Sequence, residues 1–320
     1  MKAVRHHRFG PPDVLVLEEV PDPAPGPGQL LVQVAAAGVN FADVLMRGEA
    51  GPTARFRPQI ALPATPGIEV AGTVLAAGPD TDTVLVGRRV TAFIPNGGYA
   101  ELATVPAAGA VPVPDGLDDN RALALLSQGA TAVGVIDAAG LTAADTVLVE
   151  AAGGGIGSLL VQLAKRAGAT VVAAASNERK LDLARKLGAD RVVDYSQPGW
   201  AEQAGPVTVV LETVGGRTAA EAFQLLAGRL GTRMVMYGFA SGEPADISMG
   251  DVFSVGATVI PFSLGRNPQL LPDLNRRALD LGTSGRLEPV IGDVLPLAET
   301  AAAHRAFEDR TAIGKIVLTP

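Results

Sequence analysis

The spacing of hydrophobic positions changes about a third of the way along the chain. Before that point, short apolar runs at 30–34, 69–76 and 89–93 are separated by segments rich in proline and glycine. Short runs bounded by turn residues are typical of strands joined by turns, so we expect a β-rich, barrel-like unit here. From about Asp118, the sequence DDNRALALLSQGATAVGVIDAAG places apolar residues at helical spacing instead.

Beyond this predicted helix, strand-like and helix-like segments alternate. Such alternation is typical of a parallel, doubly wound sheet, so the fold class is α/β with a second, β-rich domain. A last strand-like segment, 315–319, is expected to rejoin the first unit. The expected β-rich domain therefore covers 1–122 and 264–320, and the expected α/β domain covers 123–263. The predicted strands of the α/β domain are 146–151, 170–175, 191–194, 207–212, 233–237 and 258–262, and its predicted helices include 156–167, 178–187 and 218–226.

The segment AAGGGIG, residues 151–157, lies between a predicted strand and a predicted helix. A nucleotide phosphate site needs this arrangement. Glycines allow a tight turn and a close approach of the pyrophosphate, and the first N–H groups of the helix point toward it. Ser158 stands where the last glycine of a G-x-G-x-x-G pattern could be, and a glycine-rich turn without a ligand is the alternative interpretation. The loop residues expected to bind a nucleotide are Gly153, Gly154, Gly155, Ile156 and Gly157.

The end of the next predicted strand indicates which dinucleotide binds. NAD sites usually place an acidic residue about twenty positions beyond the loop, where it bonds the ribose hydroxyl. This chain has Ala175 and Ser176 there, followed by Arg179 and Lys180, and Tyr195 follows the third strand. Cations and hydroxyls suit the extra phosphate of NADPH, so we predict NADPH rather than NADH. The alternative is that both cations only decorate the first turn of a solvated helix, where they would oppose the helix dipole.

Composition excludes several other classes of function. The chain has 320 residues and 48% hydrophobic content, which is enough for two ordinary domains or one large one, and its net charge of −7 argues against a nucleic-acid surface. It contains no cysteine and only three histidines, which excludes disulfides, thiolate ligands for zinc and a cysteine nucleophile. No signal-like or long uninterrupted apolar segment is present, so a cytoplasmic protein without a membrane span is expected.

Further motifs recur in the same order in one protein family. They are GVNFADVLMRG, PGIEVAGTV, GRRVTAF, GGYAE, KLGADRVVDY and the C-terminal GKIVL, together with the glycine loop. Over almost its whole length, the chain resembles the zinc-independent quinone oxidoreductases, the zeta-crystallin-like branch of the medium-chain dehydrogenase/reductase superfamily. This resemblance implies a GroES-like catalytic domain, a Rossmann domain, NADPH as cofactor and commonly a homodimer.

The resemblance also implies roles for residues that match the family's motifs. Lys180, Tyr195 and Arg310 match residues that hold the adenosine phosphate, and Asn40 and Asp43 match the motif beside the nicotinamide and the substrate. Apart from the glycine loop, the residues expected at the cofactor are Thr131 near the nicotinamide, Ser176, Arg179, Lys180, Tyr195, Gly238, Phe262 and Arg310.

The chain departs from the zinc enzymes of the superfamily. They carry Gly-His-Glu where this chain has Gly67-Ile68-Glu69, and they need a cysteine ligand that it lacks. No metal is therefore expected. Glu69 is expected to be structural and paired with an arginine, and His6 and His7 are expected to be solvated.

The segment after Asp43 departs from the quinone oxidoreductases as well. That family often has tyrosines in an Arg-x-Gly-x-Tyr context, but DVLMRGEAGPTARFRPQIALPATPG contains none. A tyrosine proton donor is therefore not expected there. The added loop, 49–65, contains Arg55, Phe56 and Arg57 and is interpreted either as a lid or as a longer surface turn.

The expected chemistry follows from the absence of a metal. Without zinc, nothing in the sequence strongly polarises a simple ketone, so a quinone or a conjugated enone is the expected hydride acceptor. The expected hydrogen-bond donors to the developing oxyanion are Asn40, Tyr99 and backbone N–H groups near 262–264. Asp43 is interpreted either as part of a proton relay or as a structural residue.

Three functions remain open at this point. The first is an NADPH-dependent reductase of quinones or enones, and the second is an enoyl-thioester or 2-alkenal reductase of the same fold. The third is a nucleotide-binding protein with little turnover. The expected partners are a small-molecule substrate and a second copy of the chain, paired through the strand near 255–262.

Overall fold

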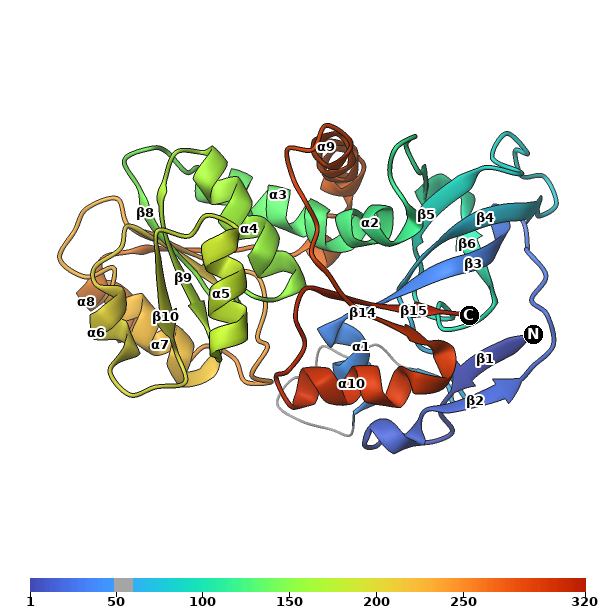
Figure 1. The fold of residues 1–320 in the computed structure, drawn as a ribbon, viewed down its shortest axis with the longest axis horizontal. Coiled ribbons are helices and arrows are strands. Elements are labelled where there is room, and N and C mark those ends of the chain that lie inside the picture. The colour runs from blue at the N-terminus through green and yellow to red at the C-terminus, as the bar shows by residue number, and fades with distance from the viewer. Residues whose placement is uncertain (49–59) are drawn as a thin grey trace. The chain divides into compact units, whose positions relative to one another are not determined.

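The computed structural model describes residues 1–48 and 60–320 (Figure 1). The chain forms two compact units. The first contains Met1–Ser127 and Leu279–Pro320, and the second contains Gln128–Ala278. The domain boundaries expected from the sequence, at 122/123 and 263/264, remain predictions.

The first unit is built on a seven-stranded sheet. Its central strand, β3, pairs antiparallel with β4, β6 and β15. Apolar residues of these strands, such as Leu30, Val32 and Val70, are completely buried and form the core of the unit, which confirms the expected β-rich fold. In order across the sheet, the strands are β14 (Ile291–Pro296), β15 (Lys315–Thr319), β3 (Gln29–Val39), β4 (Glu69–Ala77), β5 (Arg89–Phe93) and β7 (Ala110–Pro112), with β6 (Leu102–Pro106) beside β3.

The C-terminal strand β15 closes the first unit. Ile316 pairs with Val39 and Leu318 pairs with Ala37, so the end of the chain returns to the sheet that its first third began. The second unit is therefore inserted between the two parts of the first. The described part of the first unit also contains a hairpin of β1 (Lys2–Arg5) and β2 (Val16–Glu19) and the helices α1 (Phe41–Arg47), α2 (Asp119–Ala124) and α10 (Thr300–Glu308).

The second unit contains a six-stranded parallel sheet in the order β10-β9-β8-β11-β12-β13. Numbered along the chain, this is the order 3-2-1-4-5-6 of doubly wound nucleotide-binding sheets, which confirms the expected fold class. The predicted strands 170–175 and 191–194 agree with the structure, and the others differ by one or two residues at their ends. The strands are β8 (Thr146–Val149), β9 (Thr170–Ala175), β10 (Arg191–Asp194), β11 (Val209–Glu212), β12 (Arg233–Met236) and β13 (Thr258–Pro261).

Helices connect these parallel strands. The strand order reverses between β8 and β11, and ligands of such sheets bind outside the carboxyl ends of the strands at this switch point. One apolar helical stretch, Asp119–Ala139, has the length of a membrane span, but its most apolar window is 72% buried inside the protein, as in a core helix. The helices of this unit are α3 (Ala130–Ala139), α4 (Gly155–Arg166), α5 (Glu178–Lys186), α6 (Trp200–Ala204), α7 (Gly216–Gln224) and α8 (Met249–Val255), and α9 (Leu271–Thr283) runs on from it.

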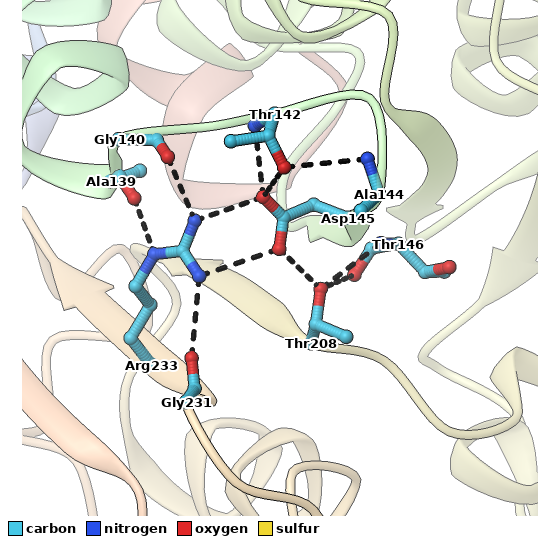
Figure 2. A network of polar contacts seen from close by, with 9 residues as sticks. All are labelled: Ala139, Gly140, Thr142, Ala144, Asp145, Thr146, Thr208, Gly231 and Arg233. Carbon is cyan, nitrogen blue, oxygen red and sulfur yellow. Dashed lines mark hydrogen bonds and ion pairs between the residues drawn. The ribbon is translucent and has the colours of Figure 1, made fainter.

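A polar network fixes the amino ends of β8, β11 and β12 (Figure 2). Arg233 donates to both carboxylate oxygens of Asp145, at 3.0 and 3.3 Å, and Thr208 Oγ1 donates to the same carboxylate at 2.7 Å. Burial acts to raise the pKa of Asp145, but the hydrogen bonds from Arg233 and Thr208 outweigh it and lower this pKa to about 2. The network therefore stabilises the edge of the sheet that lies away from the switch point.

Candidate functional site

The glycine loop lies at the switch point, between β8 and α4. Ala151 has a φ of 47°, in the left-handed region, and Gly154 is the N-cap residue of α4. A Cβ on Gly157 would overlap the carbonyl oxygen of Ala151, so only glycine allows the helix to start this close to the turn. A Cβ on Gly154 would meet only that oxygen, at 3.2 Å. The loop thus combines a tight bend, a helix N-terminus and an open approach, which are the features of a phosphate-binding turn.

The loop lies directly against the start of α5. A Cβ on Gly153 would be 2.5 Å from the Cβ of Lys180, so the missing side chain lets the lysine pack on the loop. Asn177 caps α5, and its Oδ1 accepts a hydrogen bond from the Lys180 N–H at 3.1 Å. Ser176 directly precedes this cap, and Arg179 is exposed in the first turn. The structure therefore brings the predicted phosphate loop and the predicted cations together, while their role as a phosphate site stays a prediction.

Three other predicted cofactor residues lie just beyond the carboxyl ends of strands. Tyr195 follows β10 and is half-buried. Gly238 follows β12, where a side chain would overlap Thr213, the residue after β11. Phe262 follows β13, and its ring packs so closely on Gly134 of α3 that a Cβ there would overlap it. All three are thus at the edge of the sheet that carries the glycine loop.

The last two predicted cofactor residues have different surroundings. Thr131 lies in the first turn of α3 and is half-buried. Arg310 belongs to the first unit, where it follows α10, has a φ of 56° and is exposed. The expected contact of Arg310 with the adenosine phosphate remains a prediction.

Two buried carboxyl groups lie at the switch point and were not predicted from the sequence. Glu150 follows β8, Glu212 ends β11, and both are completely buried. Glu150 accepts from the Val214 N–H at 3.2 Å, and Glu212 accepts from the Gly215 N–H at 2.6 Å. Burial raises the pKa of both groups, and the charge of Glu212 raises the pKa of Glu150 further, to about 8. The only sequence signal was a glutamate at the end of each apolar run, VLVE and VVLE.

A second cluster of buried charges lies in the first unit, around Asn40. Lys315 Nζ donates to Asn40 Oδ1 at 3.0 Å, to the Val39 carbonyl at 3.1 Å and to Glu69 Oε1. Asn40 Nδ2 donates to the same Glu69 oxygen at 2.8 Å. The prediction that Glu69 pairs with an arginine was wrong, because the C-terminal strand places Lys315 beside it instead. Both charged side chains are 0% exposed, whereas Asn40 is only partly buried.

Two predicted catalytic residues, Asp43 and Tyr99, are completely buried. Asp43 Oδ2 accepts from the Asn40 N–H at 2.9 Å, which completes a capping box at the start of α1. Burial raises the pKa of Asp43 to about 7 in spite of that hydrogen bond. The Tyr99 hydroxyl lies 3.4 Å from His304 Nε2 in the interior. The expected role of Tyr99 as a hydrogen-bond donor to the substrate stays a prediction.

The expectation that His6 and His7 are both solvated was wrong for His6. His7 is exposed and bonds Glu18 at 2.6 Å, but His6 is 2% exposed because its backbone pairs with Ala64. Burial lowers the pKa of His6, and the nearby Arg47 guanidinium lowers it further.

Arg47 is itself a buried cation that sequence reasoning did not single out. It is 2% exposed and forms an ion pair with Glu308, which links α1 to α10. Burial, with the charge of Arg47, lowers the pKa of His304 to about 3, so this imidazole is neutral in the working pH range.

A cavity of about 20 Å³ lies beside Asp43 and Arg47. It accommodates a water-sized group and not an aromatic ring. The segment with Arg55, Phe56 and Arg57, interpreted as a lid or as a surface turn, lies outside the described residues.

Metal-ligating side chains do not gather in the part of the chain that the structure describes. Within residues 1–48 and 60–320, no group of three or more histidine, cysteine, aspartate or glutamate side chains lies together. The chain contains no cysteine, and Ile68 stands where zinc enzymes of the superfamily have histidine. The residues present therefore do not fit the tetrahedral zinc site of those enzymes.

Comparison with known proteins agrees with both units. The family described as alcohol dehydrogenase GroES-like domain matches residues 26–115, and the family described as zinc-binding dehydrogenase matches residues 155–280. Among curated relatives, a 2-haloacrylate reductase of a Burkholderia species is 32% identical over 98% of this chain and 97% of its own. A quinone oxidoreductase of Pseudomonas aeruginosa is 30% identical over 100% of this chain and 99% of its own.

A solved structure extends this similarity to three dimensions. A mycobacterial protein complexed with NADPH is 31% identical, with a TM-score of 0.89 and 100% of both chains covered.

Proposed function

The chain belongs to the zinc-independent, quinone oxidoreductase-like part of the medium-chain dehydrogenase/reductase superfamily, and from this we propose that it is an NADPH-dependent reductase of quinones or conjugated enones. The mycobacterial neighbour is complexed with NADPH, and the Pseudomonas relative is a quinone oxidoreductase. Both support the proposed cofactor and reaction for this chain.

One observation carries the choice of cofactor. Lys180 packs on the glycine loop, and the position at the end of β9 that would bond a ribose hydroxyl holds Ala175 and Ser176 instead of an acid. A loop that cradles a pyrophosphate beside a cation, with no carboxylate to repel a second phosphate, favours NADPH over NADH. The residues of the second unit proposed to hold it are those of the loop with Thr131, Ser176, Arg179, Lys180, Tyr195, Gly238 and Phe262.

Bound NADPH supplies a hydride, and the protein has to accommodate the charge that this hydride creates. When a hydride forms a C–H bond with a conjugated acceptor, the electron pair of the attacked double bond moves toward the carbonyl oxygen. Asn40, the partly buried residue of its cluster, is proposed to donate a hydrogen bond to that oxygen. Water then supplies the proton. Asp43 is proposed to fix the start of α1 through the capping box, because its carboxyl group is buried and bonded to the backbone.

A second candidate is a reductase of activated alkenes, such as 2-alkenals, enoyl thioesters or haloacrylates. It is favoured by the Burkholderia relative, whose substrate has an activated C=C bond. This reaction would use the same hydride transfer and the same hydrogen bond from Asn40 to the carbonyl oxygen of the substrate.

Substrate panels separate the candidates. Steady-state NADPH oxidation is measured with benzoquinones and naphthoquinones, with enones and alkenals, and with enoyl thioesters and 2-haloacrylates, in buffer that contains a metal chelator. The proposal expects the highest kcat/KM among quinones or enones, with no loss on chelation. A preference for alkenals, thioesters or haloacrylates would favour the second candidate, and NADPH binding without turnover on any panel would contradict both.

We further propose a homodimer formed through the edge of the six-stranded sheet. Strand β13 is an edge strand, and the neighbouring helix α8 exposes Met249 and Phe253, which are 70% and 83% exposed. An unpaired strand beside exposed apolar side chains is suited to pair with its own copy. Light scattering should give twice the chain mass for the wild type and a single chain mass for Phe253→Lys. A cytoplasmic location is proposed with it and is tested by cell fractionation.

A further inference from the structure

The amide of Asn40 is held in one orientation by two buried charges. Lysine can only donate hydrogen bonds and a carboxylate can only accept them. Lys315 donates to Asn40 Oδ1 at 3.0 Å, and Glu69 Oε1 accepts from Asn40 Nδ2 at 2.8 Å. A flipped amide would place its NH2 group against an ammonium and its oxygen against a carboxylate. Both hydrogen bonds would be lost, so only one orientation fits.

The sheet brings these three residues together from distant parts of the sequence. Strands β15, β3 and β4 are neighbours, so Lys315 at the start of β15 lies beside Asn40, which follows β3, and beside Glu69, which begins β4. Gly38 makes room for the pair, because a Cβ there would be 2.7 Å from Lys315 Nζ and would overlap Glu69. The cluster therefore depends on a glycine within a strand, where glycine costs stability.

Stability alone does not account for this cluster. Two fully buried charges lose their hydration, and replacing such a pair with apolar side chains of similar size is often neutral or stabilising. The acceptors of Lys315 among the described residues lie around one end of β3, and of their side chains Asn40 is partly exposed while Glu69 is fully buried. Both buried charges, Lys315 and Glu69, thus bond to Asn40, whose side chain a ligand can reach.

We propose that Lys315 is a positioning residue that acts through Asn40: with Glu69, it fixes the amide so that the second Nδ2–H is directed at the substrate oxygen. This inference rests on the proposed reductase function. Glu69 takes the first N–H of the amide, and within residues 1–48 and 60–320 the second N–H is left for a ligand. The ammonium beside the amide oxygen also polarises the group, which makes that N–H a stronger donor to a developing oxyanion.

A double-mutant cycle tests this dependence. Asn40→Ala should lower kcat for the preferred quinone or enone by about 100- to 1,000-fold, the range for losing one preorganised donor. Lys315→Met should lower kcat to a similar extent, and the double variant should be no slower than Asn40→Ala alone, because Lys315 acts only through the amide. Losses that multiply in the double variant would overturn the proposal. The NADPH dissociation constant, measured on the same samples, should stay unchanged.

A second variant guards against a folding defect, since Lys315→Met leaves the Glu69 carboxylate buried without its cation. Lys315→Met/Glu69→Leu replaces the whole pair with apolar side chains and is expected to fold. It should retain wild-type NADPH affinity and lose kcat as Asn40→Ala does, whereas wild-type kcat in this variant would overturn the proposal. Lys165→Met, which removes an exposed ion pair with Asp190, is the control and should retain full activity.

The outcomes also distinguish this inference from the proposed function. If the wild-type protein reduces no acceptor on the panel, the proposed function fails. If the wild type is active and the Lys315 variants match it, only the positioning role fails.

Discussion

Replacement of Glu150 by glutamine should remove a strong pH dependence from the stability of the α/β unit. Glu150 and Glu212 are completely buried at the switch point, and the pKa of Glu150 is raised to about 8 by burial and by Glu212. In the unfolded chain its pKa returns to about 4.3. Between these two values, the native state holds a proton that the unfolded state has released.

The sign and size of the effect follow from this difference. A raised carboxyl pKa gives stability that is complete below the unfolded pKa and is lost as the pH rises toward the native pKa. One such proton changes the free energy of unfolding by up to about 1.4 kcal/mol per pH unit. From pH 5.5 to 7.5, Glu150 should therefore lower the free energy of unfolding of the wild type by up to about 3 kcal/mol. Glu150→Gln should not show this loss.

The single tryptophan makes the measurement specific to the correct unit. Trp200 is the only tryptophan of the chain and is buried in the core of the α/β unit, so its fluorescence reports unfolding there. Urea unfolding of wild type and Glu150→Gln at pH 5.5, 6.5 and 7.5 should show an advantage of the variant that grows with pH. Glu178→Gln, on the exposed surface of the same unit, is the control and should run parallel to the wild type. If Glu150→Gln also ran parallel to the wild type, Glu150 would not hold a proton in the native state over this pH range.

Three further predictions concern the second unit. Gly154→Ala should leave the urea midpoint nearly unchanged, since the added Cβ meets one atom, at 3.2 Å. It should weaken NADPH binding, measured by calorimetry, at least about 10-fold, and a large loss of stability would contradict this. Lys180→Ala should weaken NADPH binding by about 10-fold and NADH binding much less, and equal losses would argue against a contact with the extra phosphate. Arg233→Met should destabilise the unit by about 2–4 kcal/mol at pH 7, because it leaves Asp145 buried without its cation. Since the pKa of Asp145 is lowered to about 2, this difference should shrink as the pH falls from 4 toward 2, and a pH-independent difference would contradict it.

The parts of the fold that could be predicted from the sequence depend on contiguous patterns. The strand, glycine loop and helix of 146–167 carry their own signals, namely an apolar run, consecutive glycines and helical spacing. The order of the parallel strands then follows from general rules of handedness and switch points. Lys180 was predicted to contact the cofactor because it lies a few residues past the second strand, where nucleotide sites place the residues that contact the ribose.

The buried charges could not be predicted, because their environment is made by residues far apart in the chain. Lys315 sits in GKIVL, where a strand-end lysine looks solvated, and only the pairing of β15 with β3 buries it against Glu69. His6 looks like a surface residue until Ala64 pairs with its backbone. Tyr99 is buried as well, and its hydroxyl lies 3.4 Å from Nε2 of His304, which is 205 positions away in the sequence. Local periodicity identifies elements, whereas desolvation depends on tertiary contacts.

The most direct test of the central claim is a titration of the purified wild-type protein with NADPH and with NADH under identical conditions, with a metal chelator present. NADPH should bind at least about 10-fold more tightly, as expected for a site that has cations and lacks the ribose-binding acid. Equal affinity for the two cofactors, or binding that disappears when the chelator is added, would contradict it.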